Sequence, residues 1–421
     1  MSILIKSAKI LASGSSLNDK KHNIFISDAG IIKHIGKDAP PATKTVEGKN
    51  LKVSIGWFDM RANFNDPGLE HKEDLESGLQ AAASGGFTGV ALLPNTHPCV
   101  ESKNEVSYLM SKNARNVCQA YPMGAVTKNC KGEEFTEILD MHHAGAVAFT
   151  DGENPIWNTD ILHKTLLYLQ KVDGLLINRP EDKHLTAFGT MNESITSTLL
   201  GMKGMPGIAE EVMVKRDLEL LKYAGGKIHF ANISTAAALK QIAKAKKDGL
   251  LVTCDVAAYS LLFEDSILMD YDTNYKVNPP LRSKKDINAL LKGLASDDID
   301  VLVSAHTPHD EECKKLEFDL ADFGMLGLQT FLPMVLKSTG NDIEKILDKF
   351  TTNPRSILGL PIPEIREGEK AELTIFSTDQ DWTYDEHTNL SKSVNSPWLG
   401  KKLRGAVIGV VGNGRSFIND F

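Results

Sequence analysis

The chain has 421 residues, of which 42% are hydrophobic and 24% are charged, and its formal net charge at pH 7 is −8. This composition is typical of a soluble globular protein, and the acidic balance excludes a general nucleic-acid-binding protein, which needs a basic surface. No apolar run approaches the roughly 18 residues of a membrane-spanning helix, and the five cysteines form no Cys-x-x-Cys pair, so we expect a cytoplasmic protein with reduced thiols and no membrane partner.

Both ends of the chain carry short β-strand patterns. Residues 2–12, 23–27 and 31–36 are rich in Ile and Leu, and a turn at Gly30 separates the last two as in a hairpin. Residues 371–376 and 405–411 are again strand-like. Because chain termini often lie close together, we expect residues 1–53 and 361–421 to form one composite β-sandwich domain.

The middle of the chain, residues 54–360, alternates apolar strands with amphipathic helices. Eight strands are expected at 54–64, 89–95, 119–126, 146–151, 174–179, 227–234, 250–257 and 300–306. Helices are expected at 73–84, 133–142, 160–171, 209–223, 235–247 and 285–295. Eight such repeats predict an α/β fold, a (β/α)8 TIM barrel. A doubly wound open sheet is the alternative, but neither a GxGxxG motif after the first strand nor a P-loop supports it.

The first predicted barrel strand ends in a polar segment from Asp59 to Asn65. Arg61, Asn63 and Asn65 alternate along it and therefore share one face of the strand. Enzymes with this fold carry their chemistry at the carboxyl ends of the strands. We therefore expect the functional site at this end of the barrel.

Several short motifs follow one another in a characteristic order. They are Pro94-Asn95-Thr96, Asn278-Pro279-Pro280-Leu281-Arg282, Phe323-Gly324, Asn353-Pro354 and Asn395-Ser396-Pro397-Trp398-Leu399-Gly400. In these motifs the chain resembles the dihydroorotases of the amidohydrolase superfamily over nearly its whole length. The resemblance implies a TIM barrel of the metal-dependent hydrolase type, which uses zinc to hydrolyse dihydroorotate to carbamoyl aspartate in pyrimidine biosynthesis.

The positions that hold the metal and the catalytic base in this family are substituted here. The family's strand 1 pattern Asp-x-His-x-His-x-Arg reads Asp59-Met60-Arg61-Ala62-Asn63-Phe64-Asn65. By the same comparison, the other degenerate positions are Gly152, Arg179, Asn232 and Ala305. Arg has no lone pair to offer a metal, and zinc requires imidazole, thiolate or carboxylate ligands. We therefore expect no zinc, no other cofactor and no catalytic residue.

Other family positions are retained or altered in ways that suit ligand binding. The resemblance implies substrate contacts at Asn95, Asn278, His309, Phe323 and Gly324. Arg61, Asn63 and Arg179 are further candidates, because guanidinium groups suit carboxylate and phosphate. The alternative is that the two arginines pair with Asp59, Asp151 or Glu181 and close the mouth of the barrel.

Three functions remain open on the sequence alone. The first is an inactive dihydroorotase homologue, or pseudoenzyme, with a structural or regulatory role; inactive family members act as partners of aspartate carbamoyltransferase. The second is an active dihydroorotase or related cyclic-amide hydrolase with an atypical site. The third is a protein that binds a small anion resembling dihydroorotate. A homo-oligomer is expected in each case.

Overall fold

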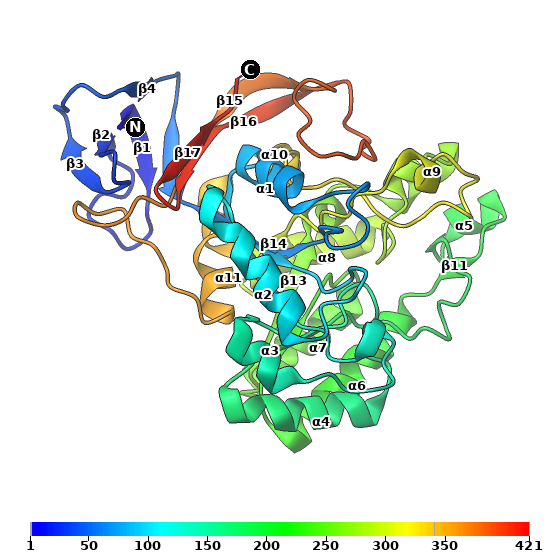
Figure 1. The fold of residues 1–421 in the computed structure, drawn as a ribbon. Helices are drawn as coiled ribbons and strands as arrows, with labels where there is room; N and C mark the ends of the chain where they lie inside the picture. The colour runs from blue at the N-terminus through cyan, green and yellow to red at the C-terminus, as the bar shows by residue number, and fades with distance from the viewer. Residues whose placement is uncertain (1, 341, 421) are drawn as a thin grey trace.

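The computed structural model describes residues 2–340 and 342–420. The chain folds into a β-sheet domain, built from both ends of the sequence, and a larger barrel surrounded by helices (Figure 1). None of the helices in the described ranges is long and apolar enough to cross a membrane.

The β-domain is one eight-stranded sheet that joins the two ends of the chain. Its strands follow the order β17-β16-β15-β5-β1-β2-β3, and β4 pairs with β1. The antiparallel pairing of β5 with β15, in which Ile55 lies opposite Leu373, connects the N-terminal and C-terminal parts. The predicted composite β-domain is therefore confirmed. The strands are β1 Ile3–Leu11, β2 Lys21–Ile26, β3 Ile32–Gly36, β4 Lys44–Val46, β5 Lys52–Ile55, β15 Leu373–Tyr384, β16 Lys401–Gly412 and β17 Arg415–Ile418.

The barrel is a closed ring of parallel strands, as predicted. One arc has the order β6-β7-β8 and the other β14-β13-β12-β9. Bridges at Gly124–Phe149 and Phe149–Leu176 join the arcs on one side, and a bridge between Ala62 and His306 closes the other. The strands are β6 Trp57–Ala62, β7 Phe87–Leu92, β8 Gln119–Pro122, β9 Leu176–Asn178, β12 Ile228–Phe230, β13 Val252–Ala257 and β14 Val301–Val303.

Two predicted strands differ from the structure. The predicted strand at 54–64 is divided at Gly56, with β5 in the β-domain and β6 in the barrel. A Cβ at position 56 would lie 2.1 Å from Oγ1 of Thr88, so only glycine fits where the chain passes from one domain to the other. The predicted strand at 146–151 makes isolated bridges at Phe149 instead of a regular ladder.

Helices cover the outside of the barrel, and their sequences explain where they begin. For example, the Asp74 side chain accepts a hydrogen bond from the Ser77 amide and caps α1. The predicted helix at 133–142 begins only at Ile138, because Phe135 forms a bridge with Thr127. The α-helices are α1 Leu75–Ser84, α2 Lys103–Ser111, α3 Ile138–Ala144, α4 Thr159–Leu169, α5 Ile195–Leu200, α6 Ile208–Ala224, α7 Ala236–Lys247, α8 Lys284–Ala295, α9 Glu311–Lys314, α10 Phe331–Thr339 and α11 Thr352–Ile357.

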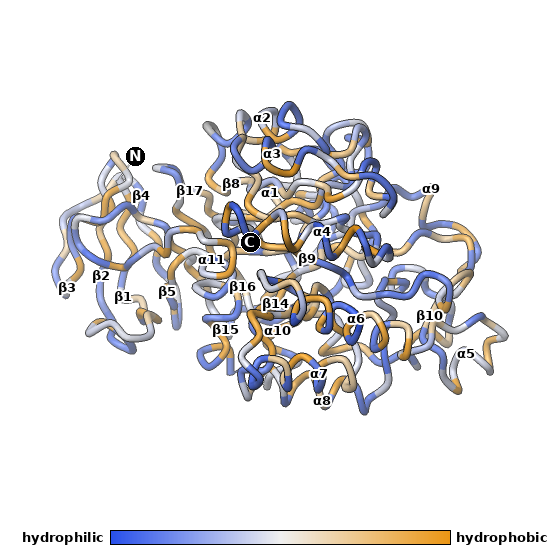
Figure 2. Tube along the Cα trace, turned by 90° about the horizontal axis from the view of Figure 1, so that it is seen from below, coloured by the Kyte–Doolittle hydropathy of each residue, from blue (hydrophilic) through white to orange (hydrophobic). Residues whose placement is uncertain are grey.

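A small outlying unit lies beside the mouth of the barrel. It contains α5 and the short parallel pair β10 (Met191–Asn192) and β11 (Gly204–Met205). It also contains the 3-10 helix η5 (Asp265–Asp270), which packs against α5. Figures 1 and 2 show α5 projecting from the barrel on the side away from the β-domain.

Candidate active site at the mouth of the barrel

The two arginines at the strand ends are buried, and each forms an ion pair with a carboxylate. Nη2 of Arg61 lies 3.3 Å from Oε1 of Glu153 and donates to the Gly152 carbonyl over 3.3 Å. Nε of Arg179 donates to the Glu153 carbonyl over 2.9 Å, and its Nη1 pairs with Glu181. The side chains of Arg61 and Arg179 are only 4% and 3% exposed. Both guanidinium groups are therefore neutralised within the protein.

Glu181 is bound by more than Arg179. It accepts a hydrogen bond of 2.5 Å from Oγ1 of Thr186 and one of 3.1 Å from Nδ2 of Asn278. Burial alone would raise the pKa of Glu181, but Arg179 and these donors together hold that pKa below its usual value. The carboxylate is therefore ionised at neutral pH and fully engaged.

The turn after Phe149 removes the carboxylate that the family uses there. Asp151 is completely buried and accepts hydrogen bonds from the amide and, over 2.6 Å, the hydroxyl of Thr127. Burial raises the pKa of Asp151 to about 6. Gly152 has a φ of +62°, and a Cβ there would lie 1.8 Å from Oδ1 of Asn95. Neither position therefore presents a carboxylate to the mouth.

The side-chain amide of Asn95 forms hydrogen bonds with the backbone of this turn and does not line a cavity. Its Nδ2 donates to the Asp151 carbonyl over 3.1 Å, and its Oδ1 accepts from the Glu153 amide over 2.9 Å. The side chain of Asn95 lines neither of the cavities described below.

The remaining strand ends carry buried polar groups that bind one another. Asp59 accepts hydrogen bonds from the amide and hydroxyl of Ser304, and burial raises the pKa of Asp59 to about 7. Nε2 of His229 lies 2.9 Å from Oδ2 of Asp255, whose other oxygen accepts from the Asn232 amide over 2.6 Å.

The resemblance assigns Ala305 to the position of the family's catalytic base. It is buried and has a φ of +48°. L-residues other than Asn and Asp rarely adopt this left-handed conformation. The backbone at this position therefore has a conformation that suits aspartate better than alanine.

Two adjoining cavities mark the mouth of the barrel. The outer one, of about 670 Å³, is lined by Asn63, Arg179, Asn278, His309 and Phe323 among others. The inner one, of about 10 Å³, lies beneath it and is lined by Asn232, Asn278, Ala305, Phe323 and Gly324 among others. Of the predicted ligand contacts, only Arg61 and Asn95 line neither cavity.

The sequence interpretation missed two residues at this site. Glu153, which lines both cavities, is the partner of Arg61. The sequence signal that could have indicated Glu153 was its position two residues after Asp151, at the same predicted strand end. Tyr259 belongs to the 3-10 helix η4 (Ala258–Leu261) after β13 and lines the inner cavity. No motif in the sequence marked it.

His309 stands at the rim, in a setting that disfavours a metal ion. Within residues 2–340 and 342–420, His309, Cys313 and Asp322 form one group whose ligand atoms lie within 4.8 Å of one another. However, Nζ of Lys72 lies 3.2 Å from Nδ1 of His309 and 3.7 Å from Oδ2 of Asp322. Burial also raises the pKa of the Cys313 thiol to about 11. An ammonium and a protonated thiol do not fit a zinc site.

The positions that the resemblance assigns to the family's zinc site are unsuited to zinc as well. The side chains there are Arg61, Asn63, Gly152, Arg179, Asn232 and Ala305. They offer neither imidazole, thiolate nor carboxylate, and the two guanidinium groups have no lone pair to offer a metal. The residues present therefore do not fit zinc.

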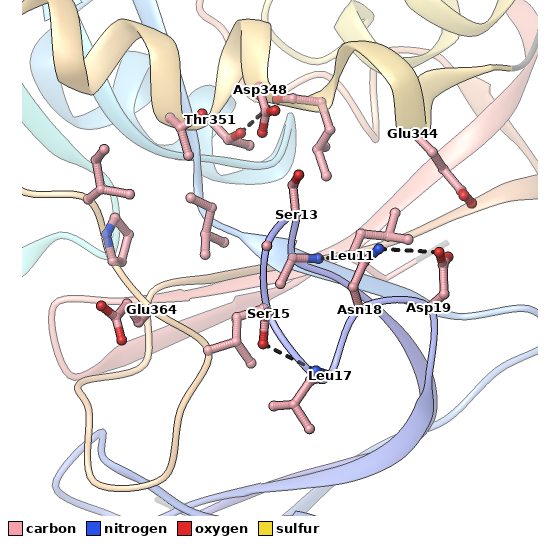
Figure 3. Close-up of a pocket in the computed structure, with 18 of the residues that line it drawn as sticks. Leu11, Ser13, Ser15, Leu17, Asn18, Asp19, Glu344, Asp348, Thr351 and Glu364 are labelled. Carbon is pink, nitrogen blue, oxygen red and sulfur yellow. Dashed lines mark hydrogen bonds between the residues drawn. The ribbon is translucent and has the colours of Figure 1, made fainter.

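A larger cavity, of about 830 Å³, lies between the β1–β2 loop and the 3-10 helix η7 (Ile343–Phe350) (Figure 3). Its charged side chains are largely paired: Nζ of Lys9 lies 2.8 Å from Asp19 and 3.0 Å from Glu344. None of the predicted site residues lines it. The mouth of the barrel is therefore the candidate functional site.

Known proteins resemble this chain in sequence and in fold. A family profile described as dihydro-orotase-like matches residues 51–238. The dihydroorotase of Geobacter sp. (strain M21) is 36% identical over 421 residues, which cover 99% of each chain. The dihydroorotase of Pelotomaculum thermopropionicum is 37% identical over 425 residues, which cover 100% of this chain and 99% of its own.

Two solved structures have the same fold. L-hydantoinase (dihydropyrimidinase) from Arthrobacter aurescens has a TM-score of 0.85 and 22% identity, over 99% of this chain and 96% of that one. D-hydantoinase (dihydropyrimidinase) from Thermus sp. has a TM-score of 0.80 and 19% identity, over 99% of this chain and 95% of that one. The likeness spans both the barrel and the β-domain.

Proposed function

The chain belongs to the dihydroorotase family, and we propose that it is a member without zinc-dependent hydrolase activity, which serves pyrimidine biosynthesis in a structural or regulatory role. The observation that carries this proposal is the pair of salt bridges formed by two buried arginines at positions that the resemblance assigns to metal ligands. Arg61 pairs with Glu153, and Arg179 pairs with Glu181. In this proposal, fixed positive charges of the protein stand where the family holds a metal ion.

The neighbouring carboxylates support the same conclusion, because each already has a partner. Asp59 is bound by Ser304, Asp151 by Thr127 and Asp255 by His229. A zinc ion would have to break these contacts and would still lie beside two guanidinium groups. Without a metal, no bound water ionises near neutral pH, and Ala305 supplies no general base.

A turnover assay tests this proposal. The purified protein is incubated with dihydroorotate, and in the reverse direction with carbamoyl aspartate, before and after zinc is added. The dihydroorotase of a curated relative serves as the positive control. We expect no turnover under either condition. Turnover that depends on added zinc would instead support an active dihydroorotase or a related cyclic-amide hydrolase, the reading that the names of the relatives favour.

A structural role also needs a surface for a partner, and exposed apolar side chains on and near α5 are the candidates for it. Phe188, Ile195 and Leu199 are 89%, 79% and 70% exposed. Between residues 185 and 208 the charged residues are Glu193 and Lys203. Large exposed apolar surfaces on soluble proteins commonly mark protein–protein contacts.

We propose aspartate carbamoyltransferase as this partner. Gel filtration of the two proteins, alone and mixed, tests the idea. A shared peak that is lost in Leu199→Glu supports it, whereas separate peaks for the wild-type proteins remove it. A dimer of this chain alone would assign the α5 surface to homo-oligomer formation instead.

The pairing of both arginines weakens the alternative of a small-anion binding protein. An anion at Arg61 or Arg179 would compete with a carboxylate that is already held nearby. A thermal-shift assay with dihydroorotate, orotate, carbamoyl aspartate and phosphate checks this point, because a ligand that binds only the folded state raises its stability. We expect none of these anions to shift the unfolding temperature.

A further inference from the structure

Three buried side-chain amide oxygens at the mouth of the barrel have no hydrogen-bond donor. They are Oδ1 of Asn63, Asn232 and Asn278. Asn63 and Asn232 are 7% and 3% exposed. The orientation of Asn278 is fixed, because its Nδ2 donates to Glu181 over 3.1 Å. Leaving a buried acceptor unpaired is unfavourable, and native proteins keep few such groups.

These acceptors line two cavities that adjoin, since they share several lining residues. Asn63 and Asn278 line the outer cavity, whereas Asn232 and Asn278 line the inner one. The two cavities share Asn278, Phe323 and Glu153 among their lining residues. The inner cavity, at about 10 Å³, has room for about one water-sized group. A small polar group can therefore reach Asn232 and Asn278 while the rest of its molecule stays in the outer cavity.

The charge around these two cavities does not favour an anion. The outer cavity is lined by three cationic side chains, Lys131, Arg179 and Lys183, and by four carboxylates, Glu133, Glu153, Glu181 and Asp322. Burial and the Lys72 ammonium lower the pKa of His309, so that its imidazole is neutral. Arg61 and Lys72 pair with Glu153 and Asp322 and add two positive charges beside this lining, so the charges around the cavities are nearly balanced.

We propose that the mouth of the barrel binds a small molecule through a nitrogen donor group, either an ammonium or a primary amide NH2. This group enters the inner cavity and donates hydrogen bonds to Oδ1 of Asn232 and Asn278. The remainder of the ligand lies in the outer cavity, where Oδ1 of Asn63 is a further acceptor. The inference rests on the proposed function, because the inner cavity borders Ala305 and Asn232, which replace the family's base and metal ligand.

Isothermal titration calorimetry with methylammonium chloride and acetamide tests the proposal. Potassium chloride controls for ionic strength, and sodium phosphate serves as the anion. We expect saturable binding of at least one nitrogen probe and none of phosphate. A response to methylammonium alone assigns a cationic ligand, and a response to acetamide alone assigns a neutral one.

A pair of variants separates recognition from folding. Asn232→Gly removes the acceptor while tolerating the φ of 52° at this position. Asn50→Gly is the matched control, because Asn50 also has a positive φ, 54°, but lies in the β-domain. We expect Asn232→Gly to weaken binding by about tenfold or more, the effect of losing one hydrogen bond to a charged donor, and Asn50→Gly to leave it unchanged.

Binding of neither nitrogen probe, tighter binding of phosphate, or wild-type affinity in Asn232→Gly would overturn the inference. The zinc content of the same protein sample is measured before the titrations. A metal-free protein that binds neither probe contradicts this inference alone. Stoichiometric zinc with turnover of dihydroorotate contradicts the proposed function instead.

Discussion

Removing one partner of the Arg179–Glu181 pair should be strongly destabilising. The two side chains are 3% and 13% exposed, so Arg179→Met leaves a buried carboxylate without its counter-ion. Breaking a buried pair costs about 3–5 kcal/mol. Because Thr186 and Asn278 still donate to Glu181, we expect the lower end of this range, a loss of about 3 kcal/mol in the free energy of unfolding.

The double variant Arg179→Met, Glu181→Met shows whether the cost comes from the unpaired charge. Removing both buried charges together is often close to neutral, so the double variant should lose markedly less stability than Arg179→Met alone. Lys164→Met is the control, because Lys164 and Asp160 form an exposed pair, with side chains 51% and 63% exposed. Its loss should stay below about 0.5 kcal/mol.

Urea-induced unfolding, followed by circular dichroism, measures all three variants against the wild-type protein. The reasoning is refuted if Arg179→Met costs no more than Lys164→Met. It is equally refuted if the double variant is as unstable as the single one, because the unpaired carboxylate would then not be the cause.

Three further predictions concern the same region. Burial raises the pKa of Asp59 to about 7 from 3.8, so between those values the folded state holds more protons than the unfolded state. The contribution of Asp59 to stability therefore falls as pH rises, by up to about 1.4 kcal/mol per pH unit. In urea titrations at several pH values, the stability of Asp59→Asn relative to the wild-type protein should rise with pH over this range, and a constant difference would contradict the assignment. Gly152→Ala should destabilise the protein by at least about 1 kcal/mol more than Gly201→Ala. Both glycines have a positive φ, but only at position 152 would a Cβ lie close to another atom, 1.8 Å from Oδ1 of Asn95. Equal losses in the free energy of unfolding, measured in urea, would show that this contact relaxes without cost. Thermal unfolding should be the same with and without a strong chelator, since no metal is expected to stabilise the fold, and a lower midpoint with the chelator would speak for a bound metal.

The fold was predictable because its signals are local. Apolar strands alternating with amphipathic helices indicated the barrel, and the β-strand patterns at both ends of the chain indicated the second domain. The fourth strand was less regular than predicted, since only Phe149 forms bridges there. Gly56 divides the first predicted strand for a reason outside that strand, the position of Thr88.

The site was predictable only in part. The sequence offered Glu181 as a partner for Arg179, because the two are two residues apart at one strand end. The partner of Arg61 lies 92 residues further along the chain, at Glu153, and its approach depends on the left-handed turn at Gly152. Contacts of this kind depend on how strand ends meet in space, which neither strand shows by itself.

The zinc content of the purified protein tests the central claim most directly. The protein is expressed in zinc-supplemented medium, purified without chelators and analysed by inductively coupled plasma mass spectrometry, with the dihydroorotase of Geobacter sp. (strain M21), prepared in the same way, as the reference. The ion pairs of Arg61 and Arg179 predict zinc far below one ion per chain. Stoichiometric zinc, lost when the protein is dialysed against a chelator, would contradict the claim that the metal site of this family has been replaced by charges of the protein itself.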